Sequence, residues 1–428
     1  MEIKNDDAQL PVSDLNRKGF ITTYPPSRYW KGTFHSEALE DNRLNLYIHI
    51  PFCIQRCRYC FFKIIELSES NQQDIDNYVD YLCKEIALVS KQYAWSKRPV
   101  DTLYFGGGTP SLLKARHLSQ IMDTLNAHYT MALSEFVFEV EPITYNKKKS
   151  EELAQFGITR LSFGIQSFSD EVVTKTGRKD TETMNIDAIQ RALDTGVIVN
   201  IDLLSGLEGE TEQSWRYSID RAIALNVHSI TVYKMELYQN SKYFSDLHKN
   251  SIILPTDDQE MAFMDYAIEQ LHANNYQNST FFTFTKNGDY PQKHLHQRWQ
   301  GEDTYGFGVS AFSSLQREYI QNTSRPEKYK AAIDQDMLPV ERGVKLTSMD
   351  LIARDIVLGM KTARLDCKWL KAKHGIDLLS SNNLMLKKLI EQNFIAVQES
   401  TIKMTNKGVF YGDFVGKALS RHFLDSFA

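Results

Sequence analysis

Three cysteines in one short stretch are the residues of this sequence best suited to chemistry. They read Cys53-Ile-Gln-Arg-Cys57-Arg-Tyr-Cys60 and follow the β-like run LYIHI and the turn-forming Pro51. Three thiolates can hold three irons of a [4Fe–4S] cubane and leave the fourth iron open to a bidentate molecule, such as the amino and carboxylate groups of S-adenosylmethionine. A zinc site short of its fourth ligand is the competing interpretation. The CxxxCxxC spacing at a strand-to-loop junction favours the cluster.

A glycine triplet follows the next strand-like run. The run DTLYF leads into Gly106-Gly107-Gly108-Thr109-Pro110. Glycines leave backbone N–H and C=O groups bare, so the charged head of a ligand such as a methionine moiety could approach this strand end closely. A tight turn would need the same residues, and the position one βα unit after the cysteine loop is what favours the ligand.

Five polar side chains stand at or near the ends of later strand-like runs. Glu139 in FVFEVEP could accept hydrogen bonds from an ammonium group, whereas Glu141, on the same face by alternation, is given a weaker functional role. Gln166 could bind an amide or a ribose, and Arg178 could pair with a carboxylate. Asp202 lies in the apolar run VIVNIDLL, where a carboxylate must be hydrogen-bonded or face a ligand such as nucleoside hydroxyls.

Two further groups of residues give weaker functional signals. His294 and His296 alternate as in a strand but have no acidic or cysteine neighbours, so a surface or substrate-pocket position is favoured over a metal site. The aromatic runs around Phe281–Phe284 and Trp299–Phe312 are typical of core, with a pocket for a flat substrate as the alternative.

The composition indicates an ordinary soluble globular protein. Its 428 residues suggest a large catalytic domain and a smaller one, and a net charge of −5 argues against nucleic acid as a partner. The N-terminus lacks a signal-peptide pattern, and no run is apolar enough to span a bilayer, so no membrane association is expected. Clustered cysteines fit metal ligation in a reducing compartment, which predicts a cytoplasmic protein. The lone Cys83 and Cys367 fit small buried hydrophobes.

The elements that must position these residues form a repeating pattern. Short β-rich runs alternate with longer helix patterns from about Leu44 to Met235, which indicates βα units. Parallel strands joined by right-handed crossovers can close into a full or partial barrel, with catalytic residues at the C-terminal strand ends. We therefore predict an α/β fold with a partial (β/α)6 TIM-like barrel. Its six expected strands are 44–50, 101–105, 136–140, 160–165, 197–204 and 229–235, and its helix patterns include 75–93, 117–129 and 184–196.

Beyond the barrel the pattern loosens. A helix over 261–275 and a strand near 279–285 are followed by a Gly-containing segment, and the last eighty or so residues are helix-rich with a β-like stretch at 395–404. The predicted division is an N-terminal segment covering the active site (1–43), the barrel (44–255), a barrel extension or cap (256–342) and a small helix-rich C-terminal domain (343–428).

Taken in order, the motifs resemble one known family. LYIHIPFCIQRCRYC, YFGGGTPSLL, FEVEP, RLSFGIQSF, TGR and NIDLLSGLEGET are similar to the radical SAM branch typified by oxygen-independent coproporphyrinogen III oxidase, the HemN-like proteins. The resemblance begins at TTYPPSRYW (22–30), continues through 300–314 and extends into 343–366, so it covers nearly the whole chain.

The resemblance implies a [4Fe–4S] cluster whose open iron binds adenosylmethionine, which is reductively cleaved to methionine and a 5′-deoxyadenosyl radical. It also implies a second adenosylmethionine beside the first, and an electron donor such as flavodoxin or ferredoxin as a partner. By motif position, contacts with the first molecule would come from Tyr47, Gly107, Gly108, Thr109, Glu139 and Arg178. Contacts around the nucleosides or the second molecule would come from Gln166, Asp202 and Phe312.

One departure separates this chain from the parent oxidase. The oxidase pattern continues with Gly-Cys after the third cysteine, whereas here Cys60 is followed by Phe61 and Phe62. We therefore expect a class C methylase or cyclopropanase, which transfers a one-carbon unit from the second adenosylmethionine to an sp² carbon of a planar or conjugated small molecule. The alternatives are a tetrapyrrole-acting enzyme, either oxidase-like or an anaerobic haem-ring-opening methyltransferase, and a haem chaperone.

Overall fold

The structure is a computed structural model that describes residues 20–32, 43–67, 72–380 and 383–425. It divides into two compact units, Ser27–Thr347 and a smaller one formed by Ser348–Ala428 with Met1–Pro26. Most of the segment 1–43, predicted to cover the active site, lies outside the described residues. No helix among the described residues is both long and apolar enough to cross a bilayer.

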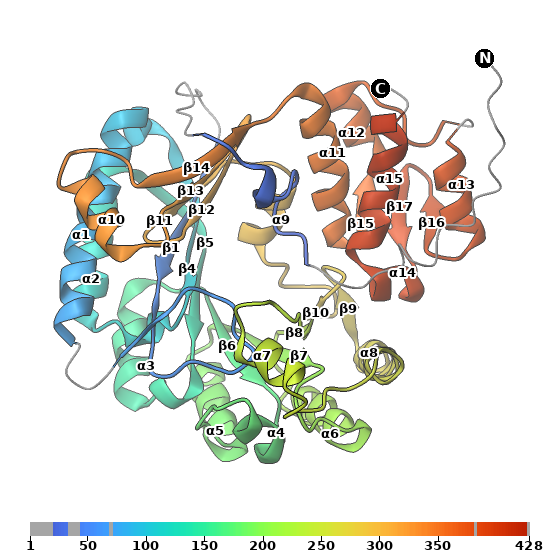
Figure 1. The fold of residues 1–428 in the computed structure, drawn as a ribbon, viewed down its shortest axis with the longest axis horizontal. Coiled ribbons are helices and arrows are strands. Elements are labelled where there is room, and N and C mark those ends of the chain that lie inside the picture. Colours follow the sequence, from blue (N-terminus) through green and yellow to red (C-terminus); the bar gives the residue numbers. More distant parts are fainter. Residues whose placement is uncertain (1–19, 33–42, 68–71, 381–382, 426–428) are drawn as a thin grey trace. The chain divides into compact units, whose positions relative to one another are not determined.

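The larger unit is built on a curved sheet of twelve strands (Figure 1). Six neighbouring strands in its middle run parallel and in chain order. They are β1 (Leu44–Ile50), β4 (Pro99–Gly107), β5 (Thr130–Val140), β6 (Arg160–Gln166), β7 (Ile198–Ser205) and β8 (Ser229–Lys234). All six predicted strands are present, and the predicted α/β partial barrel is confirmed.

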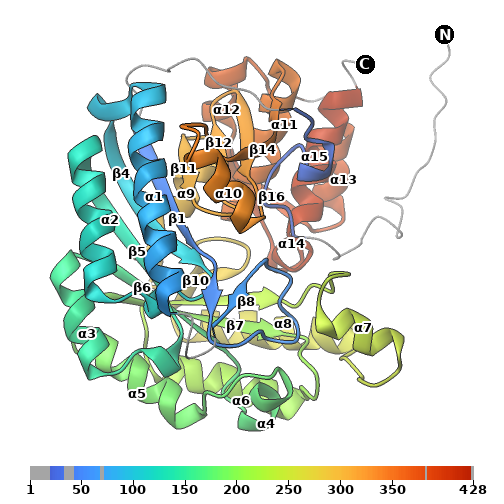
Figure 2. The same ribbon diagram turned by 60° about the vertical axis from the view of Figure 1, so that its left-hand side comes forward.

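The crossover helices lie along the outer face of this sheet (Figures 1 and 2). They are α1 (Gln72–Tyr93), α2 (Ala115–His128), α3 (Lys147–Leu153), α4 (Asp170–Lys175), α5 (Glu182–Leu193) and α6 (Glu212–Ala224). Helix α1 packs on the sheet through one apolar face. On this face Val79, Leu82 and Ile86 recur at helical spacing and are fully buried. The helix starts are set locally, since Thr181 and Thr211 cap α5 and α6 by accepting hydrogen bonds from their first-turn N–H groups.

Alternation along the strands gives the barrel a polar inner face. In β1, Leu46 and Ile48 are fully buried, whereas Tyr47 between them stays partly accessible. Polar groups on neighbouring strands join across the interior, as where the Thr102 hydroxyl donates to Asn45 Oδ1 at 2.7 Å. The interior can therefore hold charged ligands.

The segment predicted as an extension or cap adds strands to both edges of the sheet. Beyond β8, β10 (Thr283–Lys286) pairs antiparallel and β9 (Tyr276–Asn278) follows it. Beyond β1 come β11 (Thr304–Phe307), β12 (Phe312–Leu315), β13 (Glu318–Asn322) and β14 (Val340–Lys345). The predicted helix is α8 (Asp257–Ala273), and α7 (Lys242–His248) and α10 (Pro326–Ile333) are additional helices of this unit.

The expected strand-like alternation around His294 and His296 is wrong. These residues belong to a helix, α9 (Lys293–Trp299), in which His294 is buried and His296 is half-buried. Two histidines two positions apart satisfy a period of 2, but so short a stretch cannot distinguish that period from 3.6.

The smaller unit has its own hydrophobic core. It contains α11 (Ser348–Gly359), α12 (Cys367–His374), α13 (Leu384–Glu391), α14 (Asn406–Tyr411), α15 (Asp413–Asp425) and a sheet of β15 (Arg364–Asp366), β17 (Thr401–Met404) and β16 (Ile395–Gln398). The predicted hairpin at 395–404 is β16 and β17. Cys367 lies in this core, as expected, whereas Cys83 on α1 is only partly buried.

Candidate active site

The cysteine loop follows the C-terminal end of β1. Its two ends pair as parallel strands, β2 (Phe52–Cys53) and β3 (Ile65–Glu66). Within the loop, the Cys60 N–H donates to the Cys57 carbonyl at 3.1 Å. The Cys53 thiol interacts electrostatically with both other thiols, so the three predicted cluster ligands lie together.

The glycine turn after β4 lies directly against this loop. The Gly108 N–H donates to the Ile50 carbonyl at 2.7 Å. A Cβ at Gly107, where φ is +114°, would lie 2.6 Å from the His49 ring, and one at Gly108 would lie 3.0 Å from Cys53 Sγ. Any side chain would push these two strand ends apart. The tight turn and the close approach to the cysteine loop therefore both require glycine.

Thr109 joins the cysteine loop to the ends of two more strands. Its hydroxyl lies 3.5 Å from Cys53 Sγ and 3.0 Å from Glu141 Oε2. Glu141 forms an ion pair with Arg178 at 3.7 Å, and Arg178 pairs with buried Asp180 at 2.9 Å. The predicted residues Cys53, Thr109 and Arg178 are thus connected through Glu141. The sequence pattern gave Glu141 only a weak functional role, but its side chain contacts both Thr109 and Arg178.

The surroundings of the three thiols fit an iron cluster. Burial raises the pKa of Cys53 to about 12 and raises the pKa values of Cys57 and Cys60, because a thiolate loses hydration there. Iron ions would supply the positive charge that neighbouring thiolates need, with one thiolate per iron. Among the described residues, no group of three or more His, Cys, Asp or Glu side chains is placed to hold a single metal ion.

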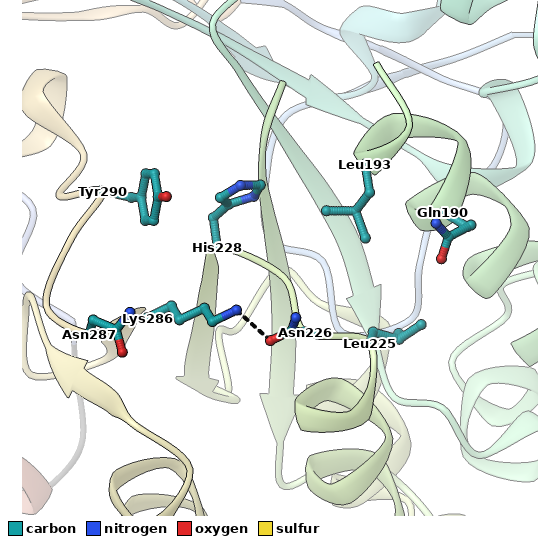
Figure 3. Close-up of a pocket in the computed structure, with 8 residues that line it drawn as sticks. All are labelled: Gln190, Leu193, Leu225, Asn226, His228, Lys286, Asn287 and Tyr290. Carbon is teal, nitrogen blue, oxygen red and sulfur yellow. Dashed lines mark hydrogen bonds between the residues drawn. The ribbon is translucent and has the colours of Figure 1, made fainter. Parts of the chain in front are cut away.

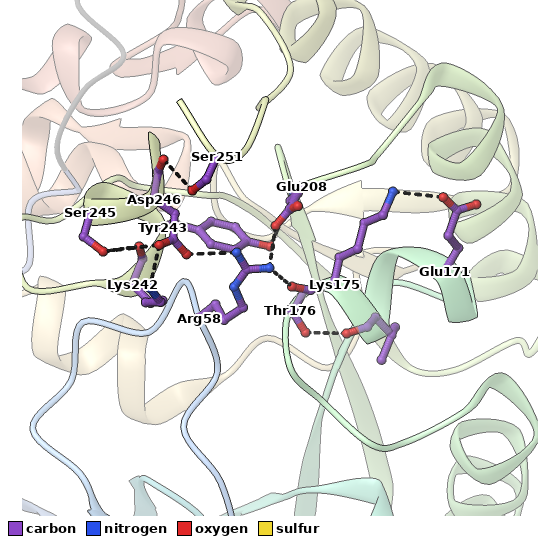
Figure 4. Close-up of polar contacts among 11 residues, drawn as sticks. Arg58, Glu171, Lys175, Thr176, Glu208, Lys242, Tyr243, Ser245, Asp246 and Ser251 are labelled. Carbon is purple, nitrogen blue, oxygen red and sulfur yellow. Dashed lines mark hydrogen bonds and ion pairs between the residues drawn. The ribbon is translucent and has the colours of Figure 1, made fainter. Parts of the chain in front are cut away.

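Arg58, between the second and third cysteines, fastens the loop to three other segments (Figure 4). Its guanidinium donates to Glu208 Oε2 at 2.7 Å and to Asp246 Oδ2 on α7 at 2.9 Å. It also donates to the Lys175 carbonyl at the end of α4 at 2.9 Å. These contacts hold the loop from segments that are far apart in the sequence.

Glu139 lies inside the barrel at the end of β5 and accepts hydrogen bonds on both carboxylate oxygens. The Tyr104 hydroxyl donates to Oε1 at 2.6 Å and the Gly107 N–H donates to Oε2 at 3.0 Å. Burial raises the pKa of Glu139 to about 7; the Tyr104 hydrogen bond opposes this rise, and the negative charge of Asp202 adds to it. A bound ammonium group would supply the missing positive charge, so this position fits the amino group of adenosylmethionine.

Asp202 and Gln166 offer polar groups on the two neighbouring strands. Asp202 accepts from the Ser162 hydroxyl at 3.1 Å and from the Asn200 amide at 2.9 Å, and burial raises its pKa to about 6. Gln166 has φ of +68°, a left-handed conformation that is uncommon outside glycine. Its side chain makes no hydrogen bond to any described residue. Strain at a strand end with an available amide is typical of a ligand-binding residue.

Tyr47 lies beside Tyr104, whereas Phe312 lies in a separate aromatic group. The Tyr47 ring is centred 5.7 Å from the ring of Tyr104, the residue that binds Glu139. The Phe312 ring meets Trp30 edge-on at 5.6 Å. No hydrogen bond or ring contact among the described residues joins Phe312 to the cysteine loop.

The two phenylalanines after the third cysteine extend an aromatic stack. The Phe61 ring is centred 3.9 Å from Tyr238 and 4.4 Å from Phe62. The Asn240 amide donates to the Phe61 carbonyl at 2.7 Å. Phe61 therefore packs the loop against the segment after β8, whereas the exposed Phe62 stands where the oxidase pattern has its fourth cysteine.

A cavity of about 480 Å³ lies away from this site (Figure 3). Its wall includes His228, which directly precedes β8, and Lys286, which donates to Asn226 Oδ1 at 2.6 Å. The cysteines follow the carboxyl end of β1. Because β1 and β8 run in the same direction within one sheet, the cavity and the cysteines are at opposite strand ends.

Sequence patterns do not identify three residues of the larger unit: Tyr104 on β4, Arg58 in the cysteine loop and Arg298 on α9. Alternation in DTLYF places Tyr104 on the inner face with Thr102, which is the signal that could have found it. Arg58 and Arg298 offer no such signal, since their partners and surroundings are set by distant parts of the chain.

Comparison with known proteins assigns this geometry to a class. Residues 47–222 match the radical SAM superfamily, a span that contains the cysteine loop, the glycine turn, Glu139 and Asp202. The chain therefore carries a radical SAM domain, and the cofactors of this class are a [4Fe–4S] cluster and S-adenosylmethionine.

Beyond that domain the chain is similar to proteins of the HemN and HemW type. It is 28% identical over 371 residues to the heme chaperone HemW of Bacillus subtilis (strain 168), covering 86% of this chain and 96% of that protein. It is 28% identical over 411 residues to the oxygen-independent coproporphyrinogen III oxidase of Escherichia coli (strain K12), covering 90% and 89%. The solved structure of coproporphyrinogen III oxidase (HemN) from Escherichia coli matches with a TM-score of 0.81 at 25% identity, covering 94% of this chain and 97% of the other.

Proposed function

We propose that this protein is a radical SAM enzyme that acts on a tetrapyrrole. The observation that carries the proposal is the extent of the match: the coproporphyrinogen oxidase structure agrees over 94% of this chain, well beyond the radical SAM span of 47–222. Both named relatives concern tetrapyrroles, one as an oxidase of coproporphyrinogen and one as a haem chaperone. This supports the tetrapyrrole alternative over methylation or cyclopropanation of an unrelated substrate.

Each residue of the site has a defined part in binding. Cys53, Cys57 and Cys60 would hold three irons of the cluster. Glu139 would accept hydrogen bonds from the ammonium group of adenosylmethionine, because its carboxylate pairs with no cationic side chain in the described part of the chain. The guanidinium of Arg178, which is held in place by Asp180, would pair with the methionine carboxylate.

The nucleoside lies along the neighbouring strands in this proposal. Asp202 would bind ribose hydroxyls and Gln166 would bind the nucleoside through its free amide. When bound beside these residues, the cluster and adenosylmethionine would supply radical chemistry at the substrate, with electrons from a donor such as flavodoxin or ferredoxin. A second adenosylmethionine, near Phe312, is part of the proposal.

The test measures tetrapyrrole-dependent cleavage of adenosylmethionine. Anaerobically reconstituted protein is reduced with dithionite and given adenosylmethionine with coproporphyrinogen III or haem. We expect 5′-deoxyadenosine to accumulate faster with the tetrapyrrole and the tetrapyrrole to change mass, with neither effect in a Cys57→Ser variant. An unchanged tetrapyrrole mass, with cleavage that does not depend on it, would contradict the proposal.

The same experiment separates a second candidate, the haem chaperone. That candidate is favoured by the match to HemW, which spans 96% of the chaperone. A chaperone should bind haem with a shift of the Soret band and return it chemically unchanged. Formation of S-adenosylhomocysteine together with a changed tetrapyrrole would indicate one-carbon transfer to the tetrapyrrole instead.

A further inference from the structure

Arg298, on helix α9, is a cation without a partner among the described residues. Its side chain makes no hydrogen bond or ion pair with any of them. It is partly exposed, and none of its nitrogen atoms is sealed from solvent. Other arginines of the interior differ, since Arg160 pairs with Glu135 at 3.1 Å and Arg178 pairs with Asp180 at 2.9 Å.

This guanidinium is half-buried among protein groups that remove part of its hydration. Protein surroundings lower its pKa by removing hydration, and Tyr319 and Tyr47 are close enough to interact with it electrostatically. His294, one turn earlier on α9, has its ring centred 5.1 Å from Tyr104. Tyr47 and Tyr104 both belong to the adenosylmethionine site described above. Arg298 therefore borders that site from the inside of the barrel.

An aromatic group stands beside the same guanidinium. The Tyr319 ring stacks on Trp30 at 5.2 Å with an interplanar angle of 6°. Trp30 in turn meets Phe312 edge-on at 5.6 Å, and Phe312 keeps part of its surface accessible. A flat conjugated molecule can stack on such rings, and a guanidinium binds a carboxylate through two parallel hydrogen bonds. The combination suits a planar molecule that carries carboxylates.

We propose that Arg298 binds a carboxylate of a ligand held inside the barrel, and that this carboxylate belongs to the substrate. An unpaired charge surrounded by protein is costly, and a ligand carboxylate would remove that cost. The inference rests on the proposed function, because the substrate it describes is a tetrapyrrole with carboxylate side chains. The methionine carboxylate of a second adenosylmethionine is the other source of the same chemistry.

The experiment compares ligand binding by Arg298→Gln, Arg298→Lys and a matched control, Arg317→Gln. Arg317 is exposed on the turn after β12 and its loss changes the net charge equally. Reconstituted protein is titrated anaerobically, by fluorescence, with coproporphyrin III and with its derivative in which every carboxylate is a neutral carboxamide. Arg298→Gln should weaken coproporphyrin binding about 10- to 100-fold and leave carboxamide binding unchanged. Arg298→Lys should retain part of the affinity, and Arg317→Gln all of it.

The outcomes separate the two carboxylate sources and the two proposals. If Arg298→Gln leaves porphyrin binding intact but removes one of two bound adenosylmethionines, the carboxylate belongs to the second adenosylmethionine. If Arg298→Gln weakens the binding of coproporphyrin III and of its carboxamide derivative equally, or changes the binding of no ligand, the proposed carboxylate site is wrong. Failure of the wild-type protein to bind any porphyrin would instead overturn the proposed function and with it the substrate assignment.

Thermal unfolding tests a merely structural role. Arg298→Gln should unfold at the wild-type temperature or higher, because no contact with a described residue is lost and an unpaired charge is removed. A clear fall in the unfolding temperature of the ligand-free protein would show that the arginine stabilises the fold, which would overturn the proposal.

Discussion

At the scale of single residues, burial sets the charge state of the barrel interior. Glu139 and Asp202 have pKa values raised to about 7 and about 6 by burial, although both accept hydrogen bonds. Arg178, in contrast, has its pKa raised by neighbouring acidic groups despite burial, so it stays charged beside the thiols. Without ligands, the Glu139 carboxyl therefore holds a proton part of the time near pH 7, and a bound cation would favour its release.

Glu139 should leave a pH signature in stability. Its folded pKa of about 7 exceeds the ordinary value of 4.5, so its stabilising contribution is complete below pH 4.5 and is lost as the pH rises through 7. Removing it with Glu139→Gln should flatten the fall in the free energy of unfolding between these pH values by about 1–3 kcal/mol. Urea denaturation of ligand-free protein measures this. Glu327→Gln, an exposed change on α10, should keep the wild-type slope, and a wild-type slope in Glu139→Gln would refute the assignment.

The three cysteines should be individually necessary for the cluster. Replacing Cys53, Cys57 or Cys60 with serine should reduce iron after reconstitution from about four atoms per chain to a small fraction of that. The visible absorption of the cluster should disappear with it. Cys83→Ser is the matched control, because Cys83 lies on α1 outside the loop, and it should bind iron like the wild type. Full iron content in any of the three loop variants would contradict the ligand assignment.

At the scale of elements, the site is a set of strand ends tied together by their loops. The cysteine loop is bound to the glycine turn through the Gly108 N–H and to α7 through Arg58. None of these ties is local in sequence. The position of the cluster therefore depends on the sheet register that brings β1, β4 and the later strands side by side.

Arg58 is expected to hold the cluster loop in place. Arg58→Gln removes ion pairs to Glu208 and Asp246, which should lower stability by about 1–3 kcal/mol and make the cluster leave several-fold faster to an iron chelator. The decay of cluster absorbance reports the second effect. Arg56→Gln changes an exposed arginine of the same loop and should alter stability by less than about 0.5 kcal/mol. Equal decay rates in both variants would show that Arg58 does not position the loop.

At the scale of the whole molecule, the residues predicted to carry the chemistry all belong to one unit. The cluster cysteines and every predicted adenosylmethionine contact lie within Ser27–Thr347. The smaller unit has a separate core that includes Leu370, Leu389 and Leu419. Each unit therefore has the internal packing that independent folding needs.

A chain that ends at Thr347 should keep the cluster. It retains the whole sheet and all three cysteines, so its far-ultraviolet circular dichroism should show a folded protein and its iron content should equal that of the full chain. Iron analysis after reconstitution decides the matter. A folded truncated chain without iron would show that the smaller unit is needed for the cluster.

The sequence by itself determined the features that depend on local order. The spacing of Cys53, Cys57 and Cys60 predicted the class of cofactor, because cluster ligation needs those residues within one loop. Hydrophobic periodicity and composition predicted the six parallel strands and the helices between them. The spacing of apolar residues that distinguishes a strand from a helix is visible within one short segment of sequence. Even so, the few residues around His294 were too short a sample, and α9 was mistaken for a strand.

Only the tertiary structure decided which side chains share the site. Glu141 meets Arg178, Arg58 meets Asp246, and Tyr104 meets Glu139, each across tens of residues or more. Arg298 is a second kind of example. It has no partner among the described residues, and this can be seen only when the positions of those residues are known. Such facts depend on distances between strands, and strand pairing sets these distances through contacts that no spacing along the chain encodes.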